Sequence, residues 1–256
     1  MKQLAFASAS AAVVCSASIL FAQSGARPAQ PAAAPQRNWY SVTVTTIKPD
    51  RVAEWIEIQK SQAIPMQQKG GIKTRETWQS GAPFGDGYTY GIVTPIDKFA
   101  TYDMPPLALR MLGDGPGRAY GDKLNAMTVS RRTFAVQDRL ELSIPPGAKF
   151  VAAILADVTI VSGHQQQYEA YIKDDVLPLL KKDKTVGFGV SRTVFGGNAN
   201  EYHEVTYLAS FAEIDKGPAQ TRLLNAAERA AMAAKITPHV AHVERTILRY
   251  APDLSY

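Results

Sequence analysis

The most constraining feature of the sequence is an internal repeat that runs from residue 38 to residue 250. The first copy opens with residues 39–47, where apolar and small polar residues alternate as in a half-buried strand, and continues into an amphipathic helical pattern from Pro49. The second copy opens in the same way with residues 150–161 and a helical pattern that begins at Ser162. Each copy reads as β-α-β-β-α-β, so the chain is predicted to consist of two similar units.

Shared local motifs support the repeat. Each first helix carries a proline after an aliphatic residue, at Pro65 and at Pro178, and we expect the missing N–H to kink or end the helix there. Residues 75–78 (RETW) before one glycine-rich hairpin resemble residues 192–195 (RTVF) before the other. These similarities indicate that the two copies correspond along most of their length.

This element order is that of the ferredoxin-like unit. Two such units in one chain resemble a tandem of the dimeric α+β barrel superfamily, and they are similar in character to NIPSNAP-like and antibiotic-biosynthesis-monooxygenase-like domains. The resemblance implies an α+β fold in which two ferredoxin-like repeats, residues 38–143 and 148–256, face each other as an intrachain pseudo-dimeric α+β barrel. It also implies that the functional site lies in the cavity between the two sheets.

The N-terminal segment is predicted to be a signal peptide of residues 1–22, because Lys2 precedes an uncharged apolar stretch that ends in small residues. Residues 23–37, rich in Pro and Ala, are predicted to be a linker. We therefore expect an exported protein, periplasmic or extracellular, with no integral membrane span after signal removal. A membrane anchor is the alternative, although serines dilute the apolar stretch. Cys15, the single cysteine, would leave with the signal, so a thiol nucleophile and a disulfide scaffold are both excluded.

Charge gives little indication of a macromolecular partner. The net charge is +5, and the basic residues are scattered among acidic ones instead of forming a stripe with interleaved aromatic residues. We therefore expect no nucleic acid partner. No G-x-S-x-G motif is present, which argues against a serine hydrolase of the nucleophile-elbow type.

Candidate catalytic residues come from the period-two pattern of two strands in the second copy. His242 and Glu244 share one face of the last strand, and Tyr202, Glu204 and Thr206 share one face of the strand at 202–211. The opposite face of that strand is more apolar and is expected to contact the helices, which would leave these residues in the cavity. The predicted catalytic residues are His242, Glu244 and Glu204; the predicted substrate-binding residues are Arg192, Tyr202 and Thr206. A histidine beside a carboxylate can abstract a proton from a phenolic or enolic substrate.

Two other interpretations of these residues stay open. The polar cluster can be a solvent-exposed rim in which arginine and glutamate pair. Alternatively, His239, His242 and His203 can form a metal or haem site, although residues three apart on a strand point to opposite faces. We expect no metal and no cofactor, and we expect His164, in the first turn of a helix, at the surface. The first copy lacks histidine and has Arg131 and Arg132 in its last strand, so an active half would be the second.

The sequence thus favours a protein that binds or transforms a small apolar or aromatic molecule, by cofactor-independent oxidation or isomerisation in the enzymatic case. The alternative is a non-catalytic binding or protein-interaction module of the cell envelope. The chain is expected to act as a monomeric pseudo-dimer or as a homodimer.

Overall fold

The computed structural model describes residues 38–81, 85–147 and 149–256, and these residues form one compact unit. The predicted signal peptide and linker lie outside the described residues. In the described part, none of the helices combines the length and the apolar character needed to cross a bilayer.

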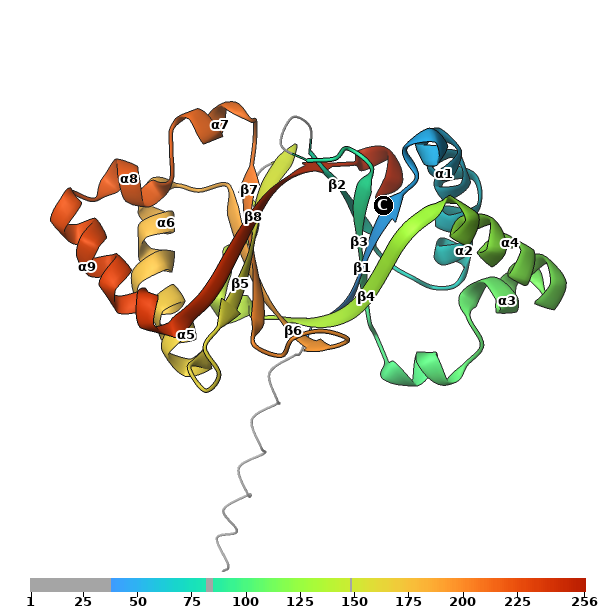
Figure 1. Cartoon of the computed structure of the whole chain (residues 1–256), viewed down its shortest axis with the longest axis horizontal. Helices are drawn as coiled ribbons and strands as arrows, with labels where there is room; N and C mark the ends of the chain where they lie inside the picture. The colour runs from blue at the N-terminus through green and yellow to red at the C-terminus, as the bar shows by residue number, and fades with distance from the viewer. Residues whose placement is uncertain (1–37, 82–84, 148) are drawn as a thin grey trace, which may run out of the picture. The chain divides into compact units, whose positions relative to one another are not determined.

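The two repeats have matching series of strands and helices (Figure 1). The main elements of the first are β1 (Trp39–Ile47), α1 (Val52–Ile58), α2 (Ile64–Lys69), β2 (Glu76–Ser80), β3 (Thr89–Pro95), α3 (Leu107–Leu112), α4 (Asp114–Met127) and β4 (Thr128–Asp138). Those of the second are β5 (Ala152–Ile160), α5 (Gln165–Tyr171), α6 (Leu177–Asp183), β6 (Gly187–Phe195), β7 (Glu201–Leu208), α7 (Ala212–Asp215), α8 (Ala219–Leu223), α9 (Ala226–Ile236) and β8 (Val240–Tyr250).

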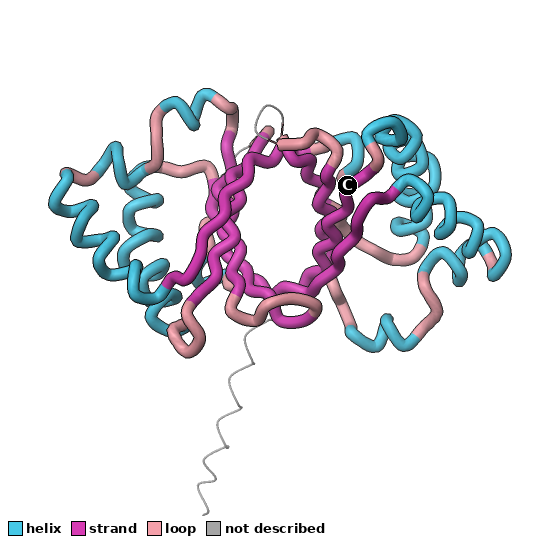
Figure 2. Tube along the Cα trace, viewed as in Figure 1, coloured by secondary structure: helices cyan, strands magenta, loops and turns pink. Residues whose placement is uncertain are grey.

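Within the described residues, eight antiparallel strands close into one barrel, in the order β1-β3-β2-β8-β5-β7-β6-β4 (Figure 2). Each repeat contributes four adjacent strands, and the repeats meet where β2 pairs with β8 and where β6 pairs with β4. These two joins are equivalent, because β2 and β6 hold the same place in their repeats, as do β8 and β4. The helices α1–α4 flank one side of the barrel and α5–α9 flank the other. The expected pseudo-dimeric α+β barrel is confirmed.

The prolines of the two first helices do not end them. In each repeat a five-residue π-helical segment, Gln59–Ala63 or Ile172–Val176, comes just before the aliphatic–proline pair, and the helix then continues as α2 or α6. A π-helical turn is wider than an α-helical turn, and it therefore accommodates the ring of the proline and its missing N–H. The prediction of a shared feature is confirmed, and neither helix ends at its proline.

Strand register corrects one of the sequence matches. Trp78 pairs with Gly91 of β3, whereas Arg192 pairs with Tyr202 of β7. At the joins between repeats, Gln79 pairs with Arg249 and Arg192 pairs with Gln137. Because Arg249 and Gln137 occupy corresponding places in β8 and β4, Arg192 corresponds to Gln79. Residues 75–78 and residues 192–195 therefore do not occupy equivalent positions in the two repeats, and their sequence similarity does not reflect structural correspondence.

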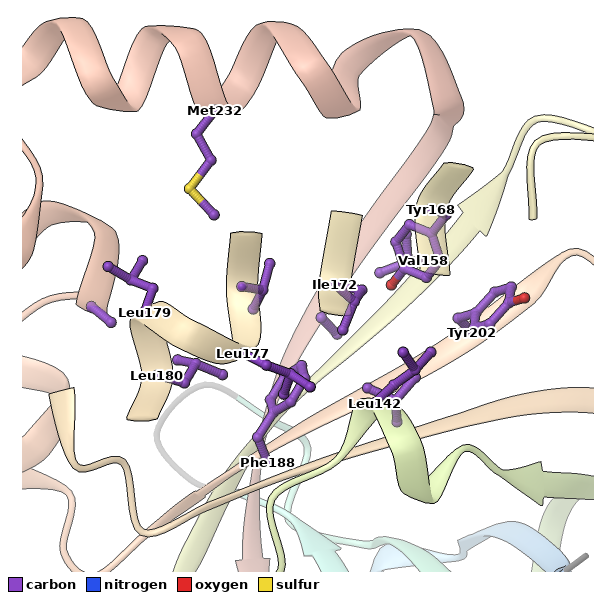
Figure 3. Packing of buried hydrophobic residues seen from close by; sticks show 14 of the residues in the cluster. Leu142, Val158, Tyr168, Ile172, Leu177, Leu179, Leu180, Phe188, Tyr202 and Met232 are labelled. Carbon is purple, nitrogen blue, oxygen red and sulfur yellow. The ribbon is translucent and has the colours of Figure 1, made fainter. Parts of the chain in front are cut away.

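Each repeat has its own apolar core between its helices and the outer face of its half of the barrel. Trp55, Ile58 and Tyr90 belong to the first core, and Tyr168, Ile172 and Phe188 belong to the second (Figure 3). The figure also shows Met232 of α9 pointing toward this second core.

The segment after the last strand of each repeat enters the core of the other. Leu142, just after β4, is buried in the second core, and Leu254, just after β8, is buried in the first. The C-terminal residue Tyr256 exchanges two backbone hydrogen bonds with Arg75, at 2.9 and 3.0 Å. The cores therefore depend on each other although their strands are consecutive in sequence.

Candidate functional site

The side chains of β7 fix which face of the second half-barrel is covered by helices. Tyr202 is buried and packs against Tyr168 of α5 with ring centroids 4.8 Å apart. The Tyr168 hydroxyl donates a hydrogen bond to Oε1 of Glu204. Tyr202, Glu204 and Thr206 therefore face the helices, and the prediction that they face the space between the sheets is wrong. Binary patterning failed here because the polar residues of β7 lie under the helices.

The register separates these residues from the other half of the predicted cluster. Ala156 of β5 pairs with Glu204 on one side and with Arg245 on the other, so these three side chains share the helix-facing side. Glu244 pairs with Asp157 and points to the barrel interior, as does His242, and both are exposed. The sheet thus lies between Glu204 and the pair His242–Glu244. The predicted cluster of His242, Glu244, Glu204 and Arg192 does not form.

A cavity of about 1080 Å³ lies between the helices and the outer face of the second half-barrel. Its floor includes Ile154, Ala156 and Val158 of β5, and its roof includes Ile172 and Val176. Glu204, Thr206, Tyr168, Tyr171 and Arg245 supply polar groups to its wall. Charged residues such as Asp183, Glu213 and Arg222 also line it, so the cavity combines an apolar floor with a polar rim. Its volume is in the range of small-molecule sites. The resemblance led us to expect the site between the sheets, but the cavity lies outside the barrel.

Glu204 is the central ionisable group of this cavity. Part of its side chain is accessible because it lines the cavity, yet protein surrounds it, and this burial raises the pKa of its carboxyl group above the ordinary value. The hydrogen bond from Tyr168 and the positive charge of Arg245 act in the opposite direction and favour the carboxylate. A carboxylate with a raised pKa is a stronger base than an ordinary glutamate.

Tyrosines surround the carboxylate. Burial, followed by the nearby charge of Glu204, raises the pKa of Tyr168 well above its usual range and that of Tyr171 to about 12. Both phenols therefore stay protonated near neutral pH and serve as hydrogen-bond donors. Both tyrosines lie among the apolar positions of this helical pattern in the sequence, and their hydroxyl groups are the sequence signal that could have indicated the site.

A second polar network holds Tyr202 beside this site. Its hydroxyl donates to Oε1 of Glu169 at 2.6 Å, and Arg139 donates to Oε2 of Glu169 at 2.7 Å. Arg192, predicted to bind substrate, donates instead to the backbone oxygen of Ala199 at 3.1 Å. Glu204 and Thr206 thus line the cavity, whereas Tyr202 and Arg192 do not.

The first repeat has no ionisable residues at the positions that correspond to Glu204 and Arg245. Thr43 of β1 pairs with Ile92 and Thr133, as Ala156 pairs with Glu204 and Arg245. Both strands also have their register shift at the same place, after Thr46 in β1 and after Thr159 in β5. Isoleucine and threonine therefore stand where the second repeat has its carboxylate and guanidinium. This difference supports the expectation that an active half would be the second.

The barrel interior carries a separate set of polar groups. His203 contacts Asp157 through Nδ1 at 2.6 Å and Thr193 through Nε2 at 2.7 Å. Burial, followed by the negative charge of Glu76, raises the pKa of Asp138 to about 6. Asp157, His203 and Thr193 are therefore connected like the triad of a hydrolase. Thr193 is fully buried, however, so its hydroxyl cannot meet a substrate.

The three histidines considered for a metal site lie apart. His203 and His242 point to the barrel interior, whereas His239 contacts His164 beside the helices. Among the described residues, no group of three or more His, Cys, Asp or Glu side chains is placed to hold a metal ion. The proposed site of His239, His242 and His203 is therefore wrong.

Comparisons with known proteins agree with this fold. No protein-family model matches the sequence, and no curated protein is a significant match in sequence. Solved structures of similar fold include a proposed monooxygenase from Lactobacillus acidophilus, with 12% identity, a TM-score of 0.55 and coverage of 86% of this chain and 96% of that one. An anthrone oxidase-like protein has 11% identity, a TM-score of 0.59 and coverage of 85% and 92%. Chlorite dismutase from Candidatus Nitrospira defluvii, as the R173K mutant, has 11% identity, a TM-score of 0.54 and coverage of 85% and 93%.

These likenesses define the class of fold. The chain has the ferredoxin-like α+β barrel fold of these proteins, with both halves of the barrel supplied by one polypeptide. At such low identity the likeness concerns the fold, and function has to be argued from the site itself.

Proposed function

We propose that the protein binds a small apolar or aromatic molecule in the cavity between the helices and the second half-barrel, and that Glu204 takes a proton from it. The observation that carries this proposal is a carboxylate of raised pKa, hydrogen-bonded to Tyr168, in the wall of a cavity of about 1080 Å³. The apolar floor of the cavity binds the carbon skeleton, and the polar groups beside Glu204 orient the acidic proton toward it.

The same wall can stabilise the anion that proton transfer creates. Arg245 lines the cavity on the same face as Glu204, and Tyr171 is a protonated donor nearby. An enolate or phenolate oxygen that accepts from these groups is stabilised as its negative charge develops. The chemistry therefore suits a carbon acid or a phenol.

Two reactions share this first step. In an isomerisation, the proton returns to a different carbon of the substrate. In an oxidation, the electron-rich anion reacts with molecular oxygen: a CH₂ group and O₂ give a carbonyl group and one molecule of water. The names of two structural neighbours, a proposed monooxygenase and an anthrone oxidase-like protein, support the oxidative version.

The first test uses anthrone, an aromatic carbon acid, with the untagged chain from Gln23. We expect binding by calorimetry and oxygen uptake at an electrode. Glu204→Gln should keep binding but lower kcat by about 100-fold or more, because the amide cannot accept the proton. Glu244→Gln is the matched control, since this glutamate faces the barrel interior, and it should change kcat by less than about twofold.

A cavity-filling variant separates binding from chemistry. Ala156→Phe places a large ring on the cavity floor between Glu204 and Arg245 and should abolish binding of anthrone. Unchanged binding by this variant, or equal loss of activity in Glu204→Gln and Glu244→Gln, would contradict the proposed site. Binding by the native chain without turnover of any carbon acid would favour the alternative of a non-catalytic binding module.

The proposed location of the protein rests on the N-terminal sequence alone. We propose that residues 1–22 direct export and are removed, which leaves a periplasmic or extracellular chain that begins near Gln23. Mass spectrometry of the mature chain from the exported fraction would give the cleavage site, and an intact N-terminus there would contradict this proposal. We likewise propose, from the order of the helices and strands, that the two repeats are related to NIPSNAP-like domains.

The proposed assembly is a monomer that is already a pseudo-dimer. The closed barrel supports it, since both joins between repeats are made within one chain. Native mass spectrometry of the same sample would distinguish this monomer from the homodimer that the sequence left open.

A further inference from the structure

Two histidines converge at one end of the second repeat. His164 lies just before α5, and His239 ends the short 3₁₀ helix Thr237–His239 that leads into β8. Their Nδ1 atoms are 3.0 Å apart, and their ring planes are inclined by 74°. Both side chains are half-buried, so the expectation of a surface position for His164 is only partly met.

The backbone fixes this arrangement. Val161 N donates to the carbonyl oxygen of His239 at 2.9 Å, and His164 N donates to the carbonyl oxygen of Val161 at 3.0 Å. Both histidines are thus tied to the same residue at the end of β5. The two imidazoles are held together before any ligand arrives, which lowers the entropic cost of using both at once.

We infer that His164 and His239 form a binding site for one divalent transition-metal ion of the Cu²⁺ type. With metal–nitrogen distances of about 2.0–2.1 Å, two nitrogens 3.0 Å apart subtend an angle of about 94° at the metal. A tetrahedral site needs nitrogens about 3.4 Å apart. The near right angle therefore suits two neighbouring positions of a square-planar or tetragonal centre, the geometry that Cu²⁺ and Ni²⁺ prefer.

Water completes the coordination, because the described residues offer no cluster of three or more ligating side chains. Without metal, one Nδ1–H donates to the other Nδ1. When the ion binds, the donor ring takes the tautomer protonated at Nε2, so both rings stay neutral and both Nδ1 lone pairs are free for the metal.

The position also connects the site to the cavity. Thr237 and Val240, on either side of His239 in the chain, line the cavity, as does Tyr168, which lies one helical turn after His164. A metal ion on the two histidines would bridge the start of α5 to the start of β8 at this edge. The inference itself rests on the histidine pair and is independent of the proposed reaction.

The test is a titration of the untagged chain from Gln23 with Cu²⁺ at pH 7.5, followed by calorimetry and electron paramagnetic resonance. We expect one tight site with a tetragonal spectrum and nitrogen hyperfine structure, and weaker binding of Zn²⁺. His164→Ala and His239→Ala should each weaken binding at least tenfold. His242→Ala is the matched control: this histidine is exposed on the other face, and its loss should change affinity by less than about twofold.

Folding is controlled separately. His164→Gln retains a hydrogen-bonding side chain, so its thermal midpoint should stay close to that of the native chain while Cu²⁺ binding is lost. A titration in which His242→Ala loses as much affinity as the other variants, or in which each single variant at His164 and His239 still binds Cu²⁺ as tightly as the native chain, would overturn the inference.

Discussion

Glu204 and Asp138 are carboxylic acids whose surroundings raise their pKa values on opposite faces of the barrel. For Glu204 the cause is burial beneath the helices. For Asp138 the causes are burial and then the charge of Glu76, and its pKa rises to about 6. When such a group ionises, it lowers the free energy of unfolding. Stability therefore does not explain its presence, and a functional role is one reason for it to be kept.

Replacing Asp138 tests this directly. Its folded pKa of about 6 exceeds the unfolded value, so the folded state holds more protons between about pH 4 and pH 6, and stability from this group is lost as the pH rises through that range. A shift of this size corresponds to about 3 kcal/mol, which solvent screening reduces to about 1–2 kcal/mol. Asp138→Asn should therefore raise the free energy of unfolding at pH 7 by about 1–2 kcal/mol.

Urea unfolding at pH 4, 5, 6 and 7 checks this expectation. The difference between Asp138→Asn and the native chain should shrink toward zero at pH 4. Asp103→Asn, at an exposed position, is the control and should stay within about 0.5 kcal/mol throughout. A difference that does not change with pH would contradict the electrostatic explanation.

At the scale of single elements, local sequence explains where α9 begins. In α9 the side chain of Asn225 accepts a hydrogen bond from Glu228 N at 3.0 Å, and Glu228 accepts one from Asn225 N at 2.8 Å. This capping box satisfies backbone donors that the first helical turn leaves free. Helix α9 places Met232 in the second core, so the capping box also supports the packing of this core beside the cavity.

Loss of this cap gives a prediction for α9. Asn225→Ala should lower the free energy of unfolding by about 1 kcal/mol, because the Glu228 N–H loses its acceptor. Asn225→Asp retains an acceptor oxygen and should cost less than about 0.5 kcal/mol. Chemical unfolding of the three chains measures both values, and equal stabilities for Ala and Asp would show that the cap contributes nothing.

At the scale of the whole molecule, the exchanged tails make the two repeats one cooperative unit. Leu254 of the second repeat completes the first core, and Leu142 of the first repeat completes the second. Both side chains are almost fully buried, with 3% and 2% of their surface exposed. Neither repeat has a complete core without the other, so we expect one unfolding transition for the described part of the chain.

Leu254→Ala tests the exchange. The cavity left in the first core should lower the free energy of unfolding by about 2–5 kcal/mol, and Leu142→Ala should do the same from the second core. In both variants tryptophan fluorescence and circular dichroism should report the same single midpoint. Leu112→Ala, at a side chain with 42% exposure, is the control and should have little effect. Two separate transitions in either core variant would show that the repeats fold independently.

The order of elements, the repeat and the fold class could be predicted from sequence because hydrophobic period and turn residues are local properties of the chain. The period-two pattern of β7 also correctly predicted that Tyr202, Glu204 and Thr206 share a face. The pattern of β8 correctly predicted the same for His242 and Glu244. Period two cannot tell which face the helices cover. In this barrel the helix-facing side of β7 carries Glu204, so the rule that the apolar face meets the helices gave the wrong side.

Tertiary structure alone decided the rest. The register between repeats showed that Arg192 corresponds to Gln79, and the packing of α5 on β7 brought Tyr168 to Glu204. The contact of His164 with His239 and the exchange of Leu142 and Leu254 join residues far apart in the chain. Such contacts depend on how whole elements pack in three dimensions, and no pattern within one strand or helix carries that information. The sequence by itself determined the architecture, and the packing of that architecture decided where a site can be.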